Sequence, residues 1–210
     1  MSGFSVFLAG AAMGALGLVL GIVAAIRAPD QATLTAVGLC ALIVLPVAGM
    51  AIGGRRFPPI NDITTNTTSP PEFVQTAKMP ENQGIEFSYP GESFARQQQA
   101  GYPELKALFV KLTPSETFLL MLAAAESNIQ WKVKVVDGLT LSLEGYEESM
   151  LFHFRDDFVV QARTANGGTL VEMRSRSRDG RGDLGVNAAR IARFLEAVSS
   201  KAIVKSTKPL

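Results

Sequence analysis

The chain has 210 residues, a formal net charge of +1 from 20 Lys and Arg against 19 Asp and Glu, and a hydrophobic fraction of 47%. Its single cysteine, Cys40, excludes a disulfide framework and a thiolate metal site within these residues. The near-neutral average hides a division between an apolar amino-terminal part and a polar remainder.

Two apolar runs stand at the amino terminus. Phe4–Ile26 contains no charged residue, and Ala32–Gly53 is a second run of the same kind. About 20 such residues cross the hydrocarbon core of a bilayer as a helix. The segment between the runs allows only a tight turn, and Pro29 helps to end the first helix. Residues 1–56 are therefore predicted to form a two-helix transmembrane hairpin whose two ends emerge on one side.

A cleavable signal peptide is the alternative for the first run. It would have a basic segment before an apolar core of about 7 to 15 residues. The chain begins Met-Ser-Gly-Phe, without a basic residue, and the run is longer than such a core. These features favour two membrane spans.

Four glycines lie along one face of the first predicted helix. Gly10, Gly14, Gly17 and Gly21 are spaced by four, three and four residues. A face of this kind lets another helix approach closely. We favour packing against the second span, which is already tethered to the first. Docking to a partner protein in the membrane is the alternative.

The polar part begins with a proline-rich lead-in and continues into a folded domain. Residues 57–103 contain seven prolines and little helical periodicity, and are predicted to wrap the domain in extended form. Residues 104–210 are predicted to form one soluble domain. Its first clear element is Thr113–Glu116, a capping box with proline at the first helical position, which predicts a helix over 117–127.

Alternation of apolar and polar residues predicts two β-hairpins. The first joins Trp131–Val135 to Leu139–Glu144, and the second joins Phe158–Arg163 to Thr169–Arg178. Each is joined around a glycine that follows Asp or Asn, which is typical of hairpin turns. Leu151–Phe154 is predicted as a short strand before the second hairpin.

A carboxy-terminal helix completes the predicted fold. Asp183 is placed to cap a helix over 184–199. Its apolar stripe is formed by Leu184, Ile191, Phe194, Leu195 and Val198. An antiparallel sheet with helices covering one face is an α+β architecture, and this is the predicted fold class.

The densest group of charges is a row of arginines. Arg174, Arg176 and Arg178 alternate with serines and therefore lie on one face of a strand. In the register of a short hairpin, Arg176 lies opposite the Asp156–Asp157 pair, which predicts a structural ion-pair network. The alternative is a site for an anionic ligand built from the three arginines and Asp157, because a planar guanidinium binds carboxylate and phosphate well.

No catalytic or metal-binding constellation is recognisable. His153, the only histidine, has no nucleophile elbow or other local signature beside it. Asp156 and Asp157 are adjacent, so on a strand they point to opposite faces and make a poor acid/base couple. No metal, cofactor or nucleic-acid partner is expected. An envelope-associated enzyme that acts through His153, Asp156 or Asp157 is one alternative function.

Six segments of the polar part form a recognisable series. They are Pro59–Thr65, Tyr102–Pro103, Trp131, Phe154–Asp157, Arg174–Arg178 and Asp183–Ile191. In this order they resemble domain-of-unknown-function family 1499, which is found in bacteria and in plastids, and the likeness covers about residues 58–195. The residues that carry the motif are Asp62, Thr64, Asp156, Asp183, Asn187 and Arg190. Asn66, Asp179 and Gly182 depart from the family's pattern.

The resemblance implies no established activity, but it bears on which side of the membrane holds the domain. Arg55 and Arg56 after the second run, against Arg27 in the turn, favour the cytoplasm. Some relatives resemble lipoproteins or lumenal plastid proteins, with the domain outside the cytoplasm. On this ground we predict a bacterial inner-membrane protein with a periplasmic domain, and a cytoplasmic domain is the alternative.

The function expected from these features is that of a membrane-anchored, non-catalytic interaction or assembly module. Its partners would be the lipid bilayer and a membrane protein complex. The alternative is a binding module for an anionic small molecule or a lipid headgroup. Residues 174–208 carry 9 basic against 3 acidic residues, which suits that second function. We favour instead that this basic part neutralises the acidic part of the domain across the sheet.

Overall fold

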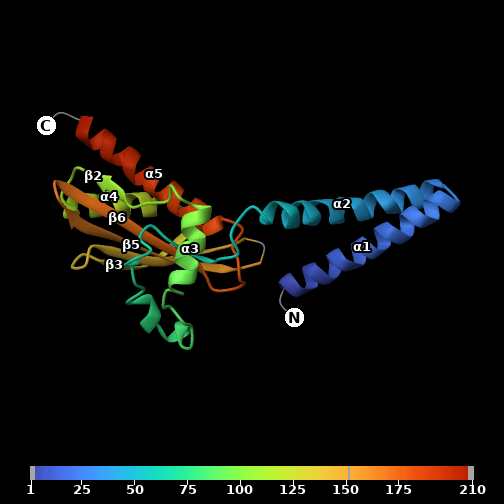
Figure 1. The fold of residues 1–210 in the computed structure, drawn as a ribbon, viewed down its shortest axis with the longest axis horizontal. Helices are drawn as coiled ribbons and strands as arrows, with labels where there is room; N and C mark the ends of the chain where they lie inside the picture. Colours follow the sequence, from blue (N-terminus) through green and yellow to red (C-terminus); the bar gives the residue numbers. More distant parts are fainter. Residues whose placement is uncertain (1–2, 151, 208–210) are drawn as a thin grey trace. The chain divides into compact units, whose positions relative to one another are not determined.

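The structure is a computed structural model that describes residues 3–150 and 152–207. The chain divides into two compact units, Met1–Phe57 and Pro58–Leu210. The first unit is a pair of α-helices, α1 (Gly3–Arg27) and α2 (Gln31–Gly54) (Figure 1). Both helices are long and apolar enough to cross a membrane.

Three of the four glycines predicted to pack helices lie against α2. A Cβ atom placed on Gly21 would come within 2.8 Å of Val37 Cγ2, and one on Gly17 or Gly14 would also meet α2 side chains. A Cβ on Gly10 would meet nothing within 4 Å. The glycine face therefore brings the two helices of this unit together along most of its length, while Gly10 takes no part.

The second unit is built on one antiparallel sheet. Its strands are β1 (Asp62–Thr64), β2 (Leu108–Val110), β3 (Trp131–Asp137), β4 (Ser142–Glu148), β5 (Arg155–Ala165) and β6 (Gly168–Ser177). The order across the sheet is β1-β6-β5-β4-β3, and β2 pairs with a further part of β6. Both predicted hairpins, β3–β4 and β5–β6, are confirmed.

The described helices of this unit include two short 3₁₀ turns and three α-helices. They are η1 (Thr76–Lys78), η2 (Pro80–Asn82), α3 (Glu92–Gly101), α4 (Pro114–Glu126) and α5 (Val186–Thr207). Helices α4 and α5 cover one face of the sheet (Figure 1). The predicted α+β class is therefore confirmed.

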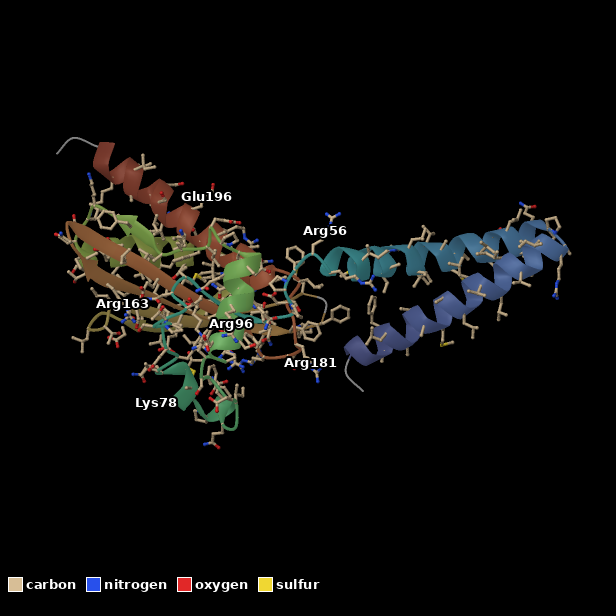
Figure 2. All side chains as sticks on the ribbon, viewed as in Figure 1. Arg56, Lys78, Arg96, Arg163, Arg181 and Glu196 are labelled. Atoms are coloured by element: carbon tan, nitrogen blue, oxygen red, sulfur yellow. The ribbon has the colours of Figure 1, made fainter. Side chains whose placement is uncertain are left out.

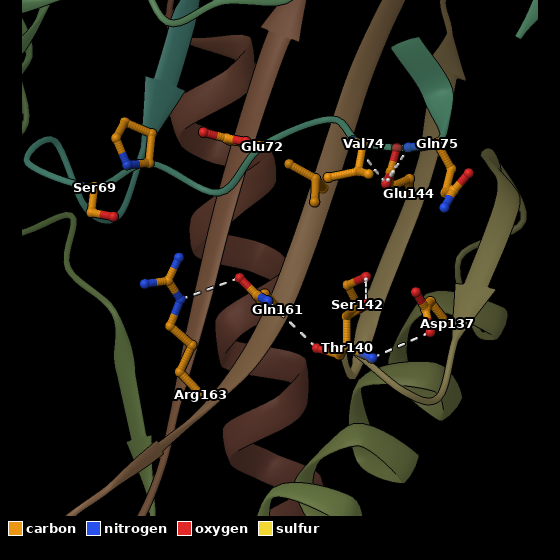
Figure 3. A pocket seen from close by; sticks show the side chains of 12 residues that line it. Ser69, Glu72, Val74, Gln75, Asp137, Thr140, Ser142, Glu144, Gln161 and Arg163 are labelled. Atoms are coloured by element: carbon orange, nitrogen blue, oxygen red, sulfur yellow. Dashed lines mark hydrogen bonds between the residues drawn. The ribbon is translucent and has the colours of Figure 1, made fainter. Parts of the chain in front are cut away.

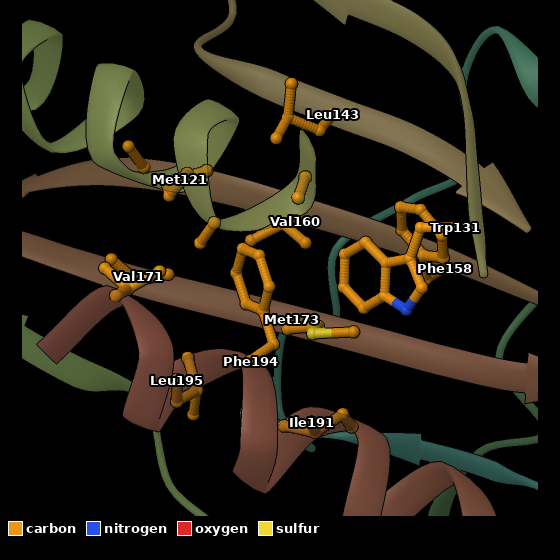
Figure 4. Packing of buried hydrophobic residues seen from close by; sticks show 14 of the residues in the cluster. Met121, Trp131, Leu143, Phe158, Val160, Val171, Met173, Ile191, Phe194 and Leu195 are labelled. Carbon is orange, nitrogen blue, oxygen red and sulfur yellow. The ribbon is translucent and has the colours of Figure 1, made fainter. Parts of the chain in front are cut away.

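The main core lies between the sheet and the helices α4 and α5 (Figure 4). Trp131 stacks on Phe158 of β5 at 4.0 Å and on Phe194 of α5 at 5.0 Å between ring centroids. Its indole N–H donates to Glu147 at 3.0 Å, which satisfies the polar atom of a buried ring. The aromatic stack thus ties the last helix to the centre of the sheet.

The other face of the sheet is covered by the chain between β1 and α3. Phe73 and Phe87 of this segment pack with Val159 of β5 in a second, smaller apolar cluster. We call residues 65–90 the covering segment. Its regular structure is limited to the two 3₁₀ turns, so contacts to the sheet determine its path.

The extended lead-in was predicted over residues 57–103. From Pro58 on it is part of the second compact unit and contributes β1 and α3 to it. Gln98 of α3 is buried, and its side-chain amide accepts from Thr64 N at 2.9 Å and donates to Thr64 O at 2.5 Å. The amide therefore satisfies both backbone groups of a strand edge, as a neighbouring strand would do.

Three local expectations differ from the structure. Leu139 is 98% exposed because β4 begins only at Ser142, so Leu139 lies in the turn. Leu151 lies outside the described residues, and the rest of the short strand predicted there, 152–154, forms a turn and loop. Leu184 is half-exposed because α5 begins at Val186 rather than at residue 184.

The capping box at the start of α4 is confirmed, and it provides a pH test of stability. Glu116 accepts from Lys205 of α5 at 2.9 Å and from Thr113, and these bonds lower its pKa from 4.5 to about 2. The ionised carboxylate therefore stabilises the folded state above the unfolded-state pKa, and this contribution is lost as pH falls through about 2.

We expect Glu116→Gln to lower the free energy of unfolding at pH 7, and this loss to shrink towards zero as the pH approaches 2. Urea denaturation of the second unit, which has its own core, measures the difference between variant and wild type at each pH. A difference that stays constant from pH 7 to the acid limit would show that the carboxylate charge plays no part.

Candidate functional site

The arginine row of β6 lies on the sheet face under the covering segment. Arg176 is opposite Asp62 of β1 on one side and opposite Asp157 of β5 on the other. The register predicted from the turn, with Arg176 opposite Asp157, is therefore present. Five charged side chains, three arginines and two aspartates, stand together on three adjacent strands.

Arg174 is the most deeply buried member of the row. Its Nε and Nη2 donate to the two carboxylate oxygens of Asp62 at 2.8 and 2.7 Å, and Nη2 also donates to the backbone oxygen of Phe87 at 2.9 Å. The guanidinium also lies over the rings of Phe73 and Tyr89, at 5.1 and 5.4 Å from their centroids. Burial raises the pKa of Asp62, although the bonds from Arg174 act in the opposite direction.

Arg178 forms the second ion pair. Its Nη2 and Nε donate to the carboxylate of Asp157 at 2.7 and 2.9 Å, and the Asp157 side chain is fully buried. The prediction that Arg176 would supply this partner is wrong. The arginine at the next position on the same face is long enough to reach the carboxylate diagonally. Burial raises the pKa of Asp157, and Arg178 opposes that rise.

Arg176 contacts the covering segment instead. It donates to the backbone oxygen of Glu86 and lies over the ring of Phe87, 4.9 Å from its centroid. The ion pairs found within residues 3–150 and 152–207 do not include Arg176. Burial lowers its pKa. The row thus contains one cation more than its aspartates neutralise.

A second network lies on the helix side of the sheet, around Arg190 of α5. Arg190 donates to Asp156 at 2.7 Å, to Glu147 at 3.0 Å and to Ser175 Oγ at 3.0 Å. Burial acts to lower the pKa of Arg190, but the bonds and charges of Glu147 and Asp156 outweigh it and raise the pKa. Asp156 therefore binds an arginine on the helix side of the sheet and Asp157 binds one on the covered side, as the adjacency of the two residues predicted.

Asn187 and Asp183 extend this network to the start of α5. Asn187 accepts from Ser175 Oγ at 2.7 Å and donates to Ser177 Oγ at 3.0 Å. Asp183 accepts from the backbone N–H groups of Gly185 and Asn187 at 2.9 and 2.8 Å, which is the capping role predicted for it. The six motif residues, Asp62, Thr64, Asp156, Asp183, Asn187 and Arg190, thus bind partners that hold strands, helices and the covering segment in place.

His153 stands apart from both networks. It lies exposed in the β4–β5 loop, with Nδ1 2.7 Å from Glu148 Oε1. No group of three or more His, Cys, Asp or Glu side chains placed to hold a metal ion occurs in the part of the chain that the structure describes. Neither Asp156 nor Asp157 points towards the histidine as an acid/base partner, since both bind arginines.

Two cavities open on the covered face of the sheet. One, of about 310 Å³, is lined by Glu144, Gln161 and Arg163 among others (Figure 3). Glu144 is buried there, and its carboxylate accepts from the backbone N–H groups of Val74, Gln75 and Thr76 at 2.7 to 3.1 Å. It therefore caps the start of η1 and binds this part of the covering segment to β4.

The other cavity, of about 450 Å³, is lined by Arg174 and by the aromatic residues Phe73, Phe87 and Tyr89. The Tyr89 hydroxyl is buried and has no hydrogen-bond partner among the described residues. Burial raises the pKa of Tyr89 to about 12, so this hydroxyl is neutral and can donate. Sequence reasoning missed Tyr89, since a single tyrosine in a proline-rich segment carries no local signal.

Comparison with known proteins gives a family and no activity. The family model described as "Protein of unknown function (DUF1499)" matches residues 62–198. Curated proteins give no match. A crystal structure of Ara h 8.0201 matches with a TM-score of 0.38 and 10% identity, over 47% of this chain and 95% of that one. So distant a likeness carries no inference about function.

The two arginines that flank Asp157 are expected to differ in their effect on stability. Arg178→Ala leaves a buried carboxylate without its partner and should cost about 3 kcal/mol or more of unfolding free energy. Arg176→Ala removes one bond, one ring contact and the attraction of Asp62 and Asp157, but it leaves no buried charge without its partner, so its cost should stay within about 1 kcal/mol. Urea denaturation of residues 58–210 measures both.

The double variant Asp157→Ala/Arg178→Ala provides the control. It should lose much less than the sum of the two single variants, because no unpaired charge remains buried. Additive losses, or a larger loss for Arg176→Ala than for Arg178→Ala, would contradict the assignment of the pair.

Proposed function

The chain belongs to the DUF1499 family of proteins of unknown function, and we propose that it is a membrane-anchored, non-catalytic interaction module of a membrane complex. Two helices of membrane-spanning length support the anchoring. We further propose that it resides in a bacterial inner membrane, with the domain on the periplasmic side.

The observation that carries the proposal is the use of the charged motif residues. Asp62 and Asp157, both buried, each accept two N–H bonds from an arginine, and Asp156 binds Arg190. A general acid or base must reach its substrate and exchange a proton with it. Carboxylates closed off by guanidinium groups serve better to hold a rigid surface in shape than to act as reactants.

Purification of the full chain in a mild detergent tests this proposal. We expect mass spectrometry to find one or more proteins retained in stoichiometric amount, because a rigid module is suited to stable contacts. The helix pair alone, residues 1–57, is the matched control, and it identifies proteins held only by the apolar helices. Retention of a defined lipid or metabolite without any protein would contradict an interaction module.

Binding of an anionic small molecule or lipid headgroup is the second candidate function, and two observations favour it. Arg176 is a half-buried cation outside the ion pairs of the row. It contacts Glu86 and Phe87, and both of these residues line the cavity of about 450 Å³, whose lining also includes Tyr89 and the paired Arg174. A guanidinium outside the ion pairs suits a carboxylate or a phosphate.

Titration with inorganic phosphate and with a short-chain phosphatidylglycerol tests this second function. We expect the wild type to bind at least one of these probes, and Arg176→Met to bind it about tenfold more weakly, since a charge-assisted bond to the anion is lost. Arg193→Met removes an exposed arginine of α5 and is the matched control. Equal binding by the two variants would show that Arg176 is not the site.

A further inference from the structure

One end of the sheet gathers exposed apolar side chains. Because the sheet is antiparallel, the start of β3, the end of β4, the start of β5 and the end of β6 share this end. The loops that meet there contain Ile129, Met150 and Leu184, which are 90%, 86% and 49% exposed. We call Ile129, Met150, Leu184 and the exposed Arg181 the loop end.

The chain enters the domain at the same end. Pro58 precedes β1, whose first residue pairs with Arg176 near the end of β6. Only residues 55–57 separate the end of α2 from Pro58. A chain spans at most about 3.6 Å per residue, so Pro58 lies on the order of 14 Å or less along the chain from the last residue of the apolar helix.

The charges of the residues that connect α2 to the domain favour an anionic surface. Arg55 and Arg56 follow α2 directly, and Arg181 projects from the β6–α5 loop (Figure 2). Asp179 is the exposed acidic residue of that loop. Arginines beside exposed aliphatic side chains match the interface of a bilayer, where the apolar groups meet acyl chains and the cations meet phosphate groups.

We propose that the loop end of the domain rests in the headgroup layer of the bilayer. Met150, Ile129 and Leu184 enter the interface, and Arg181 binds anionic headgroups. The inference rests on the membrane anchoring proposed above. It deepens that proposal, because three loops and a tether would fix the orientation of the domain as well as its distance from the membrane.

Leu184 offers a variant that leaves the backbone unstrained. Its φ of 54° lies in the left-handed region, which a leucine adopts at a cost and an asparagine tolerates better. Leu184→Asn therefore removes an apolar side chain from the loop end without an expected loss of fold. Leu139, 98% exposed in the β3–β4 turn at the other end of the sheet, provides the matched control position.

The test uses the full chain with Cys40→Ala, reconstituted in vesicles of phosphatidylcholine and phosphatidylglycerol that contain lipids with nitroxide headgroups. Met150→Cys and Leu139→Cys each carry an environment-sensitive fluorophore. We expect the label at position 150 to be quenched several-fold more strongly than the label at position 139. Addition of Leu184→Asn should weaken the quenching at position 150.

Flotation of the vesicles reports the anchoring separately. A protein that floats with the vesicles while both labels are quenched equally, or not at all, overturns the inference and leaves the anchoring intact. A blue shift at position 150 without lipid quenching indicates a contact between protein copies and overturns it as well. A protein that does not float overturns the anchoring, and the inference falls with it.

Discussion

Arg174 has 1% of its surface exposed, in the middle of the sheet, and much of the domain is arranged around that buried charge. A buried ion without a partner costs several kcal/mol. The pairing of β1 with β6 brings Asp62 to the guanidinium. The path of the covering segment across the sheet brings the backbone carbonyl of Phe87 to it as well. The segment's own regular structure is slight, so this ion pair and Glu144 largely determine its path.

Strands β5 and β6 divide the remaining charges between the two faces of the sheet. Asp156 turns to Arg190 and holds α5, whereas Asp157 turns to Arg178 under the covering segment. The β5–β6 hairpin thus connects three layers, namely the covering segment, the sheet and α5. The polar contacts between these layers require particular partners, whereas apolar packing alone would accept many side chains.

Local patterns in the sequence predicted much of this fold, because they depend on neighbouring residues. The alternation in both hairpins and the capping box of Thr113 needed no tertiary information. The register opposite Arg176 could also be predicted, but the choice of Arg178 as the partner of Asp157 depends on what else Arg176 contacts. The bond from Gln98 to Thr64 joins residues 34 positions apart, and no local pattern indicates it.

A rigid polar framework has a consequence for recognition by this domain. Side chains already held by several bonds lose little conformational freedom when a partner binds. The entropic cost of binding is therefore smaller, and the net binding free energy is more favourable. The proposed tethering to a membrane would act in the same direction, because it would raise the local concentration of the domain near membrane partners. Arg176 differs from the other two arginines of the row: strand pairing fixes its backbone, and the aspartates beside it neutralise Arg174 and Arg178. Its charge is therefore the one in the row that an incoming anion can neutralise without breaking an ion pair.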